Sequence, residues 1–178
     1  MRPTVIVLAS GRGERFLASG GGTHKLQALL DGKTVLQHTL DAVRASGLPC
    51  HVEDAGHPGM GDSIAAAVRA TADAEGWLIL PADLPLVQPG TLQRIAAAPD
   101  AQEVVRPLFQ GRQGHPVRFS RTCGAALMAL AGAQGAAPVV RRHRLWTIAV
   151  DDIGCVTDID TVQDLQQALQ ILRSRQPH

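Results

Sequence analysis

The sequence has few aromatic residues and no large excess of either charge. Aromatic residues make up 3% of the chain and tyrosine is absent, so a surface on which nucleic-acid bases stack is not expected. The 17 basic and 16 acidic residues leave a net charge of +1, which is too small to hold a polyphosphate backbone. Both shortages argue against a nucleic-acid partner.

Cysteines and long apolar runs are also scarce. The three cysteines, Cys50, Cys123 and Cys155, are odd in number, lie far apart and form no C-x-x-C pair. They argue against a disulfide framework or a cysteine zinc site and fit a reducing compartment. No run approaches the roughly 18 apolar residues of a membrane span, and the apolar run Val5–Ala9 is too short for a signal-peptide core. We therefore expect a cytoplasmic protein with no membrane partner.

The remaining composition is typical of a globular fold. Hydrophobic residues make up 45% and charged residues 19% of the 178 residues. Because one domain takes about 150 residues on average, we expect residues 1–178 to form a single domain.

Apolar β-branched runs alternate with segments of helical spacing. The predicted strands are Thr4–Ala9, Pro49–Val52, Trp77–Leu80, Val104–Phe109, Pro116–Phe119 and Trp146–Val150. The predicted helices are Thr34–Ser46, Asp62–Thr71, Gly90–Ala98, Arg121–Ala131, Ala136–His143 and Thr161–Leu172. The alternation predicts an α/β fold with a mostly parallel sheet flanked by helices, in which ligands bind beyond the carboxyl ends of the strands. The turn Gly111–Gly114 predicts a small β-hairpin insertion.

A glycine-rich loop, Ser10–Gly22, follows the first predicted strand. Gly11 and Gly13 leave backbone N–H groups free to hold phosphate, and Arg15 adds a charged donor. No G-K-[ST] follows, which excludes a Walker A motif, and Phe16 stands where a dinucleotide motif requires its third glycine. These residues alone leave phosphate binding and a plain glycine turn both open.

Three carboxylates and a lysine are further candidates. Asp83 follows the strand Trp77–Leu80, and Asp158 and Asp160 alternate so that an extended segment would point them the same way. Mg²⁺ prefers one or two carboxylates plus substrate phosphates. Lys25 could meet a triphosphate as a point charge. A turn aspartate, a helix cap and a solvated lysine are the alternatives.

The segment Gly59–Ser63 precedes a predicted helix, so Ser63 could contact a nucleobase or simply cap that helix.

Other common catalytic motifs are missing from the sequence. The seven histidines form no H-E-x-x-H motif. His51 and His57 flank a loop and make only a weak zinc candidate. The absence of a G-x-S-x-G elbow argues against an α/β-hydrolase.

Taken in order, these segments resemble the nucleotidyltransferases that attach a nucleotide to molybdopterin. Leu8–Phe16 (LASGRGERF) is similar to the family's L-A-A-G-x-G-x-R-[MF] loop, and Lys25–Leu36 resembles its K-L-L-x-x-x-G-K-P-L-L run. Gly59–Ile64 (GMGDSI) resembles G-M-G-x-S-L, and Leu80–Val87 (LPADLPLV) resembles L-x-G-D-x-P-L-V. Two later signatures are matched by Gly111–Val117 and Thr157–Thr161. The resemblance extends from about residue 4 to residue 170.

The resemblance implies a Rossmann-like nucleotidyltransferase fold. It also implies magnesium-dependent transfer of CMP from CTP to the terminal phosphate of molybdopterin, with release of pyrophosphate. The L-A-x-G loop and the G-M-G-x-S segment look more like the cytidylyl branch than the guanylyl branch, whose loop usually reads L-x-G-G. A molybdoenzyme that receives the product would be a possible protein partner.

The resemblance also assigns roles to individual residues. Those implied as catalytic are Arg15, Lys25 and Asp83. Those implied as nucleotide-binding are Ala9, Ser10, Gly11, Gly13, Gly61 and Ser63. Asp83, with Asp160 or Asp158, would hold Mg²⁺, and Gly114 and His115 would lie toward the acceptor.

The chain departs from the family pattern at several positions. Ala82 replaces the glycine before Asp83, which requires a backbone without positive φ there. The insert between Arg15 and Lys25 is longer than usual, so loop closure is expected to bring Lys25 into place. Ala133–Ala136 replaces a G-D-x-G-A-R-like segment and loses an acid and a base, which weakens the match on the acceptor side.

Two alternatives to cytidylyl transfer stay open. One is the same chemistry with GTP or with a different phosphorylated acceptor. The other is a non-catalytic nucleotide-binding module that assists a molybdoenzyme. The joint presence of Arg15, Lys25, Asp83 and Asp160 favours catalysis.

Overall fold

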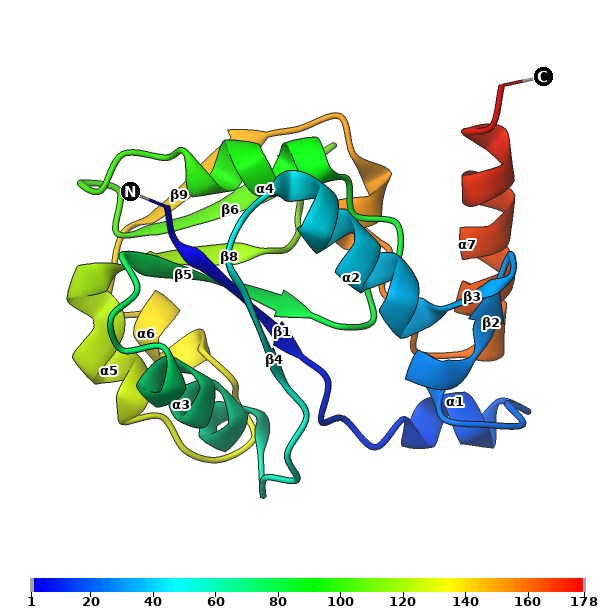
Figure 1. Cartoon of the computed structure of the whole chain (residues 1–178), viewed down its shortest axis with the longest axis horizontal. Coiled ribbons are helices and arrows are strands. Elements are labelled where there is room, and N and C mark those ends of the chain that lie inside the picture. Colours follow the sequence, from blue (N-terminus) through cyan, green and yellow to red (C-terminus); the bar gives the residue numbers. More distant parts are fainter. Residues whose placement is uncertain (1, 178) are drawn as a thin grey trace.

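The computed structural model describes residues 2–177, which build a seven-stranded sheet with helices on both faces (Figure 1). The strands of this sheet are β1 (Thr4–Leu8), β4 (Cys50–Glu53), β5 (Gly76–Pro81), β6 (Val104–Phe109), β7 (Arg112–Gln113), β8 (Val117–Ser120) and β9 (Leu145–Ala149). Their order is β4-β1-β5-β8-β6-β7, and β9 pairs with β6. The predicted α/β class with a nucleotidyltransferase-like sheet is confirmed.

The helices are α1 (Glu14–Ala18), α2 (Val35–Ser46), α3 (Met60–Ala70), α4 (Pro89–Ala96), α5 (Gly124–Met128), α6 (Ala137–Val140) and α7 (Val162–Ser174). Short 3₁₀ turns are η1 (Lys25–Gln27), η2 (Arg121–Cys123) and η3 (Ile153–Val156). Thr34 and Thr161 cap α2 and α7, each in a capping box. Gly47 ends α2 in the left-handed conformation, as its sequence position predicts.

The strand directions decide which loops meet at the ligand edge. β1 is parallel to β4 and β5, and β6 is parallel to β9, whereas β8 runs antiparallel to both β5 and β6. The end of β5 therefore lies beside the start of β8, where Ile79 pairs with Val117. The loops after β1, β5 and β6 and the segment before β8 share one edge of the sheet.

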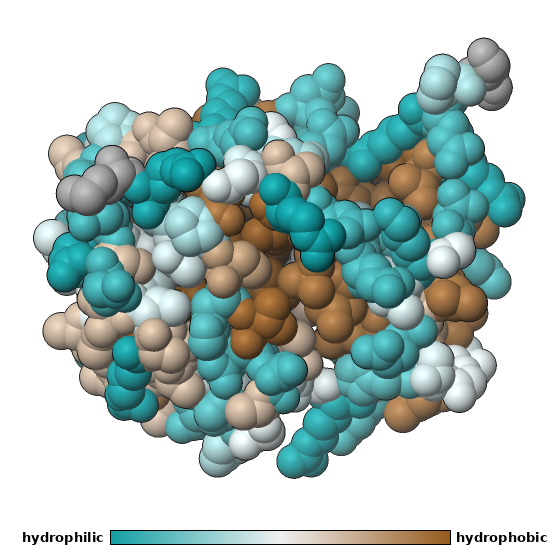
Figure 2. Space-filling view, viewed as in Figure 1, coloured by the Kyte–Doolittle hydropathy of each residue, from teal (hydrophilic) through white to brown (hydrophobic). Residues whose placement is uncertain are grey.

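The core has one apolar layer on each side of the sheet. One layer contains Leu78, Leu80 and Leu92 and meets α2, α4 and α7; the other contains Ile64, Trp77 and Phe119 and meets α3 and α5. Figure 2 shows apolar side chains gathered on the face next to α7, with polar side chains around them. Within residues 2–177 no helix has the length and apolarity needed to span a membrane.

Several local elements differ from the sequence predictions. Val104–Phe109 and Val117–Ser120 do pair, but they belong to the central sheet, and the tight turn falls at Gln110–Gly111 with positive φ at both residues. A separate two-stranded hairpin, β2 (Leu29–Leu30) with β3 (Lys33–Thr34), turns at Asp31–Gly32 in the same way. The helices predicted over residues 121–131 and 136–143 are shorter in the structure.

Candidate functional site

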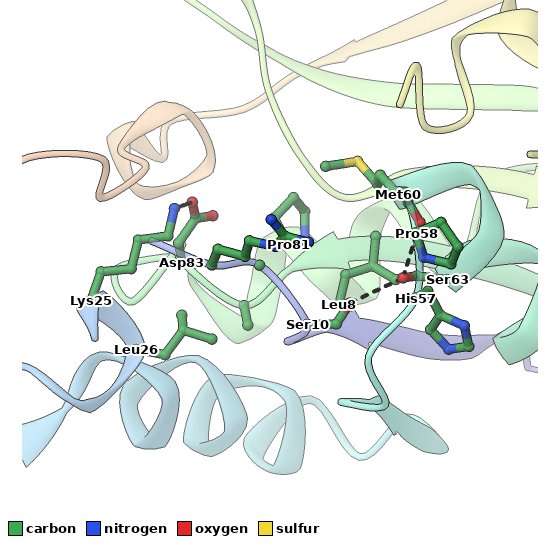
Figure 3. A pocket seen from close by; sticks show the side chains of 14 residues that line it. Leu8, Ser10, Lys25, Leu26, His57, Pro58, Met60, Ser63, Pro81 and Asp83 are labelled. Atoms are coloured by element: carbon green, nitrogen blue, oxygen red, sulfur yellow. Dashed lines mark hydrogen bonds and ion pairs between the residues drawn. The ribbon is translucent and has the colours of Figure 1, made fainter. Parts of the chain in front are cut away.

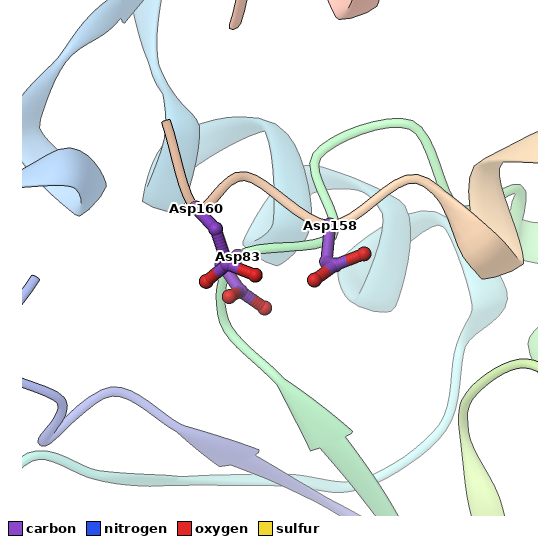
Figure 4. A group of neighbouring side chains, drawn as sticks. All are labelled: Asp83, Asp158 and Asp160. Atoms are coloured by element: carbon purple, nitrogen blue, oxygen red, sulfur yellow. The ribbon is translucent and has the colours of Figure 1, made fainter. Parts of the chain in front are cut away.

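A lysine and three carboxylates meet beyond the end of β5. The Lys25 ammonium donates to Asp83 Oδ2 at 2.8 Å and to Asp160 Oδ1 at 3.2 Å. Asp158 completes the group, with carboxylate oxygens of the three aspartates within 4.8 Å of one another (Figure 4). Arg15 Nη2 lies 3.4 Å from Asp160 Oδ1, although its side chain is 79% exposed. The sequence predicted these five residues separately, and the fold brings them to one place.

The electrostatics of the cluster follow from burial and close charges. Burial raises the pKa of Asp83, although the Lys25 charge opposes this. Burial alone would lower the pKa of Lys25, but Asp83 and Asp160 outweigh it and raise the value. Burial and a hydrogen bond with Asp160 raise the pKa of Asp158 to about 6. Burial opposes ionisation of Asp160, but the bond with Asp158 and the Lys25 and Arg15 charges lower its pKa. The Lys25 ammonium thus lies between two carboxylates whose pKa values are shifted in opposite directions.

The glycine-rich loop lies beside this cluster, and a hydrogen bond from His24 holds it in place. Gly13 has φ +67°, a backbone conformation that favours glycine, and a Cβ there would lie a tight 3.2 Å from the His24 ring. The Leu26 N–H donates to His24 Nδ1, which leaves His24 Nε2–H to donate to the Gly11 carbonyl at 2.6 Å. His24 therefore ties the loop to the segment that carries Lys25. Lys25 already contacts Asp83 in this arrangement of the loop.

The loop also contacts the first turn of α3. The hydroxyls of Ser10 and Ser63 lie 3.0 Å apart. α3 begins at Met60, so Ser63 belongs to the helix and not to a preceding loop. Ala82 avoids positive φ, which in the described chain occurs outside glycine at Asp31 and Gln110. This fits the requirement set by replacing the glycine before Asp83.

Three neighbouring cavities follow this edge of the sheet. The central pocket, about 290 Å³, is lined by Ser10, Lys25, Ser63, Asp83 and neighbouring side chains (Figure 3). The loop pocket, about 370 Å³, lies between the glycine-rich loop and Asp160 and shares Gly11, Arg12 and Lys25 with the central pocket. The β8 pocket, about 290 Å³, contains His115 and Val117 and shares Leu8, Met60 and Pro81 with the central pocket.

Some predicted site residues line none of these three cavities. The Ala9 N–H donates to the Glu53 carbonyl within the sheet edge. Gly61 packs against the backbone of Ala131, where a Cβ would come within 2.9 Å. Gly114 likewise packs on the backbone of Cys155. These residues support the shape of the site, whereas Gly11, Gly13 and His115 line its cavities.

Sequence reasoning missed other residues at the site. It gave no role to His24, Met60, Arg106 or Arg141, although a histidine next to Lys25 was a signal that could have been used.

The two histidines considered as a weak zinc candidate contact a carboxylate instead. His51 and His57 each bring Nε2 to the buried Glu53 carboxylate, at 3.0 and 2.9 Å. These ring nitrogens are thus occupied by a carboxylate, and this lowers the pKa of Glu53 against its burial.

The comparison that decides the family covers the middle of the chain. The model of the MobA-like NTP transferase domain matches residues 42–146, which is more than half of the 178 residues. The chain belongs to this family. As a MobA-like NTP transferase it is a nucleotidyltransferase, whose family uses a nucleoside triphosphate and a phosphorylated acceptor. No curated protein matches its sequence significantly.

Solved structures of similar shape cover nearly the whole chain. Rv0371c from Mycobacterium tuberculosis H37Rv is 28% identical with a TM-score of 0.74, covering 96% of this chain and 99% of its own. Its complex with manganese is 27% identical with a TM-score of 0.75 and the same coverage. A nucleotidyl transferase from Methanothermobacter thermautotroptrophicus, 22% identical, has a TM-score of 0.81 over 97% of this chain and 98% of its own, and shows the shared fold.

The carboxylate cluster has the chemistry of a divalent metal site. Its donors are hard carboxylate oxygens, which suit Mg²⁺ or Mn²⁺. The Lys25 ammonium between Asp83 and Asp160 shows that the arrangement accommodates a cation. The residues present therefore fit a metal of this class.

Proposed function

We propose that this chain transfers the CMP group of CTP to the terminal phosphate of molybdopterin, with residues 1–178 acting as one domain. The observation that carries the proposal is Lys25 held between Asp83 and Asp160 at the junction of the loop and central pockets. A triphosphate in the loop pocket would place its charges against Lys25, Arg15 and the amides of Gly11 and Gly13. The nucleoside would occupy the central pocket beside Ser10 and Ser63.

The reaction is a substitution at the α-phosphorus. An oxygen of the acceptor phosphate forms the new bond to this phosphorus, and the bond to the β-phosphate breaks, so pyrophosphate leaves with the electron pair. The protein supplies position and charge, with no covalent intermediate. Lys25 and Arg15 stabilise negative charge on the phosphates. Asp83, with Asp160 or Asp158, would hold Mg²⁺, which when bound neutralises phosphate charge.

The choice of CTP rests on the L-A-S-G loop and the G-M-G-D-S segment, which resemble the cytidylyl branch. GTP is the second candidate, because the fold is shared with a molybdopterin-guanine dinucleotide biosynthesis protein from Archaeoglobus fulgidus, 18% identical with a TM-score of 0.70, covering 96% of this chain and 99% of its own. A thermal-shift panel of CTP, GTP, ATP and UTP with Mg²⁺ separates these candidates. A ligand at about 100 times its Kd stabilises the fold by about 2.7 kcal/mol. A shift with GTP alone would contradict the cytidylyl assignment.

The catalytic prediction is tested by Asp83→Asn. We expect pyrophosphate release with CTP, Mg²⁺ and molybdopterin to fall by about 10²-fold or more, because Mg²⁺ and the Lys25 ammonium lose a carboxylate partner. Asp73→Asn is the matched control, since Asp73 is exposed and lies away from the three cavities. Unchanged turnover in Asp83→Asn would overturn the assignment. CTP binding without pyrophosphate release in the unmodified protein would favour a non-catalytic module.

A further inference from the structure

A cysteine, a histidine and a glutamate meet at the edge of the sheet opposite the carboxylate cluster. Glu103 precedes β6, Cys123 ends η2 just after β8, and His143 lies between α6 and β9. Cys123 Sγ lies 3.9 Å from His143 Nε2, which lies 4.0 Å from Glu103 Oε2. At this edge the end of β8 pairs with the start of β5, whereas Asp83 lies beyond the other end of β5. The group is therefore separate from the candidate site.

His143 is held so that its Nε2 can act as an electron-pair donor. Its Nδ1–H donates to the Val139 carbonyl at 2.8 Å, because a carbonyl oxygen can only accept. In the neutral imidazole the other nitrogen, Nε2, then carries the lone pair. A backbone carbonyl on one ring nitrogen commonly orients the histidine ligands of metals. Nε2 faces the Cys123 sulfur and the Glu103 carboxylate, which are two further metal-ligating groups.

Neighbouring groups also position the glutamate. The Thr122 hydroxyl donates to Glu103 Oε1 at 2.8 Å, which leaves Oε2 to face His143. The Ser120 N–H donates to the Glu103 carbonyl at 2.8 Å and joins the end of β8 to the start of β6. Cys123 is 1% exposed, whereas the side chains of His143 and Glu103 are 21% and 44% exposed. The group is thus open to solvent on the side of Glu103.

The separations fit a small metal ion between the groups better than direct contacts. An N–H···O hydrogen bond spans about 2.7–3.2 Å, so the 4.0 Å between His143 and Glu103 leaves a gap. The sulfur, nitrogen and oxygen ligands of a tetrahedral Zn²⁺ lie about 3.4–3.6 Å from one another. The 3.9 Å between Cys123 and His143 is slightly wider than this. Glu103, the most exposed of the three, closes the site by rotating its side chain.

The donor atoms select a different ion from the one that suits the carboxylate cluster. Thiolate and imidazole ligands favour Zn²⁺, whereas carboxylates alone suit Mg²⁺ and Mn²⁺. The sequence argued against a zinc site built from cysteines, and only one cysteine takes part here. Glu103, Cys123 and His143 follow one another at intervals of 20 residues, which are longer than the short spacings by which zinc motifs are recognised.

We propose that Cys123, His143 and Glu103 form a Zn²⁺ site that joins η2, the segment after α6 and the start of β6. The ion is bound by Cys123 Sγ, His143 Nε2 and a Glu103 carboxylate oxygen, and water takes the fourth position. Binding replaces the thiol proton, which is released to solvent. Because the ligands come from three separate segments, the bound ion stabilises the folded chain. The site does not depend on the proposed function, since it lies at the other edge of the sheet.

The test uses Co²⁺ and Zn²⁺ with the full chain, freed of metal by a chelator and kept reduced by a phosphine. Co²⁺ bound by a thiolate shows a sulfur-to-metal charge-transfer band in the near ultraviolet, which oxygen ligands do not produce. We expect this band, its displacement by Zn²⁺, and its loss in Cys123→Ser. Cys50→Ser is the matched control and is expected to keep the band. Cys50 is exposed and is followed by His51, so it offers the same two types of donor.

A second variant keeps the thiol, in case Cys123→Ser fails to fold. In His143→Gln we expect Zn²⁺ to bind about 100-fold more weakly, measured by competition with a chromophoric indicator. Losing a group that only orients a ligand already costs about 10–100-fold, so Thr122→Val is expected to weaken Zn²⁺ binding about tenfold. His38→Gln is the control for the histidine, because His38 lies on α2 and contacts the Leu30 carbonyl.

Four results would overturn the inference. They are no charge-transfer band in the unmodified chain, an equal band in folded Cys123→Ser, loss of the band in Cys50→Ser, or unchanged Zn²⁺ affinity in His143→Gln. Loss in Cys50→Ser would assign the thiolate ligand to the exposed cysteine instead. Circular dichroism shows whether each variant is folded.

Discussion

The Lys25 ammonium lies between two of the carboxylates of the candidate site. Its side chain is 14% exposed and contacts two aspartates that are 15% and 24% exposed. Such a buried arrangement is costly to break from one side, because the remaining charges lose their partner. The same ammonium faces the cavity in which we place the triphosphate. Residue identity at this position therefore matters for both folding and chemistry.

We predict that Lys25→Met lowers the turnover of pyrophosphate release by about 10²-fold, because a donor to the phosphates is lost. Steady-state kinetics at saturating CTP check this. Lys33→Met is the control, because Lys33 is 57% exposed and pairs with Asp41 on the surface, where such pairs contribute little. Equal loss in both variants would show that the effect is not specific to the site.

The sequence identifies the residues of the cluster as candidates, but it does not predict that they lie close together in the fold. Asp83, Asp158 and Asp160 lie beyond strand ends or in an extended segment, which marks them as candidates. Lys25 follows a long glycine-rich insert, and its spacing gives no hint that η1 already places it against Asp83. That placement depends on the His24 bond to Gly11, a contact set by the tertiary structure.

One buried carboxylate, that of Asp152, connects the helices behind the site. Asp152 is 2% exposed and accepts hydrogen bonds from the N–H of Gln88, the hydroxyl of Thr91 and the N–H of Gly154. Arg175, just after α7, lies 3.3 Å from the same carboxylate. Asp152 thus joins α4, η3 and the end of α7, and η3 leads directly into Asp158.

We predict that Asp152→Ala lowers the free energy of unfolding by about 2–4 kcal/mol, because several buried donors lose their acceptor. Chemical denaturation measures the change. Its exposed neighbour Asp151, changed to Ala, serves as the control and is expected to stay within about 0.5 kcal/mol. A loss in Asp152→Ala no larger than in this control would refute the role of Asp152.

Long periodic elements were predictable, and short ones were not. α2 and α7 have apolar residues at helical spacing and threonine caps, so their sequences define both type and start. α1, with 5 residues, and the strands β2 and β3, with 2 each, have no periodic pattern to detect. α5 and α6 are shorter than their alanine-rich sequences suggested, and a turn with positive φ at Gly132 and Gly135 separates them.

The free energy of unfolding of the protein is expected to decrease as the pH falls below neutrality, because of His115. Burial lowers the pKa of His115 to about 4 in the folded chain, from its ordinary value of 6.5. The unfolded state then binds a proton at a higher pH than the folded state. The stabilisation is fully present above pH 6.5 and is lost as the pH falls toward 4.

The free energy of unfolding of the unmodified chain is expected to fall between pH 7 and pH 4. We predict that this fall is about 3 kcal/mol smaller in His115→Gln, which lacks the titrating imidazole. Denaturation curves at several pH values, for the variant and the unmodified chain, give the difference. His38→Gln is the control, because His38 lies on α2 and does not line the β8 pocket. Parallel pH profiles for His115→Gln and the unmodified chain would contradict the prediction.

The reversed direction of β8 has a consequence for how this chain handles two substrates. The loop and central pockets are built mainly by segments that leave β1 and β5, whereas the β8 pocket also contains the segment that enters β8. Under the proposed function, the nucleotide would contact segments that leave strands, and the acceptor would contact a segment that enters one. On that proposal, changes to the connection before β8 would alter the choice of acceptor while the loops around the triphosphate keep their form, so the two preferences could diverge independently.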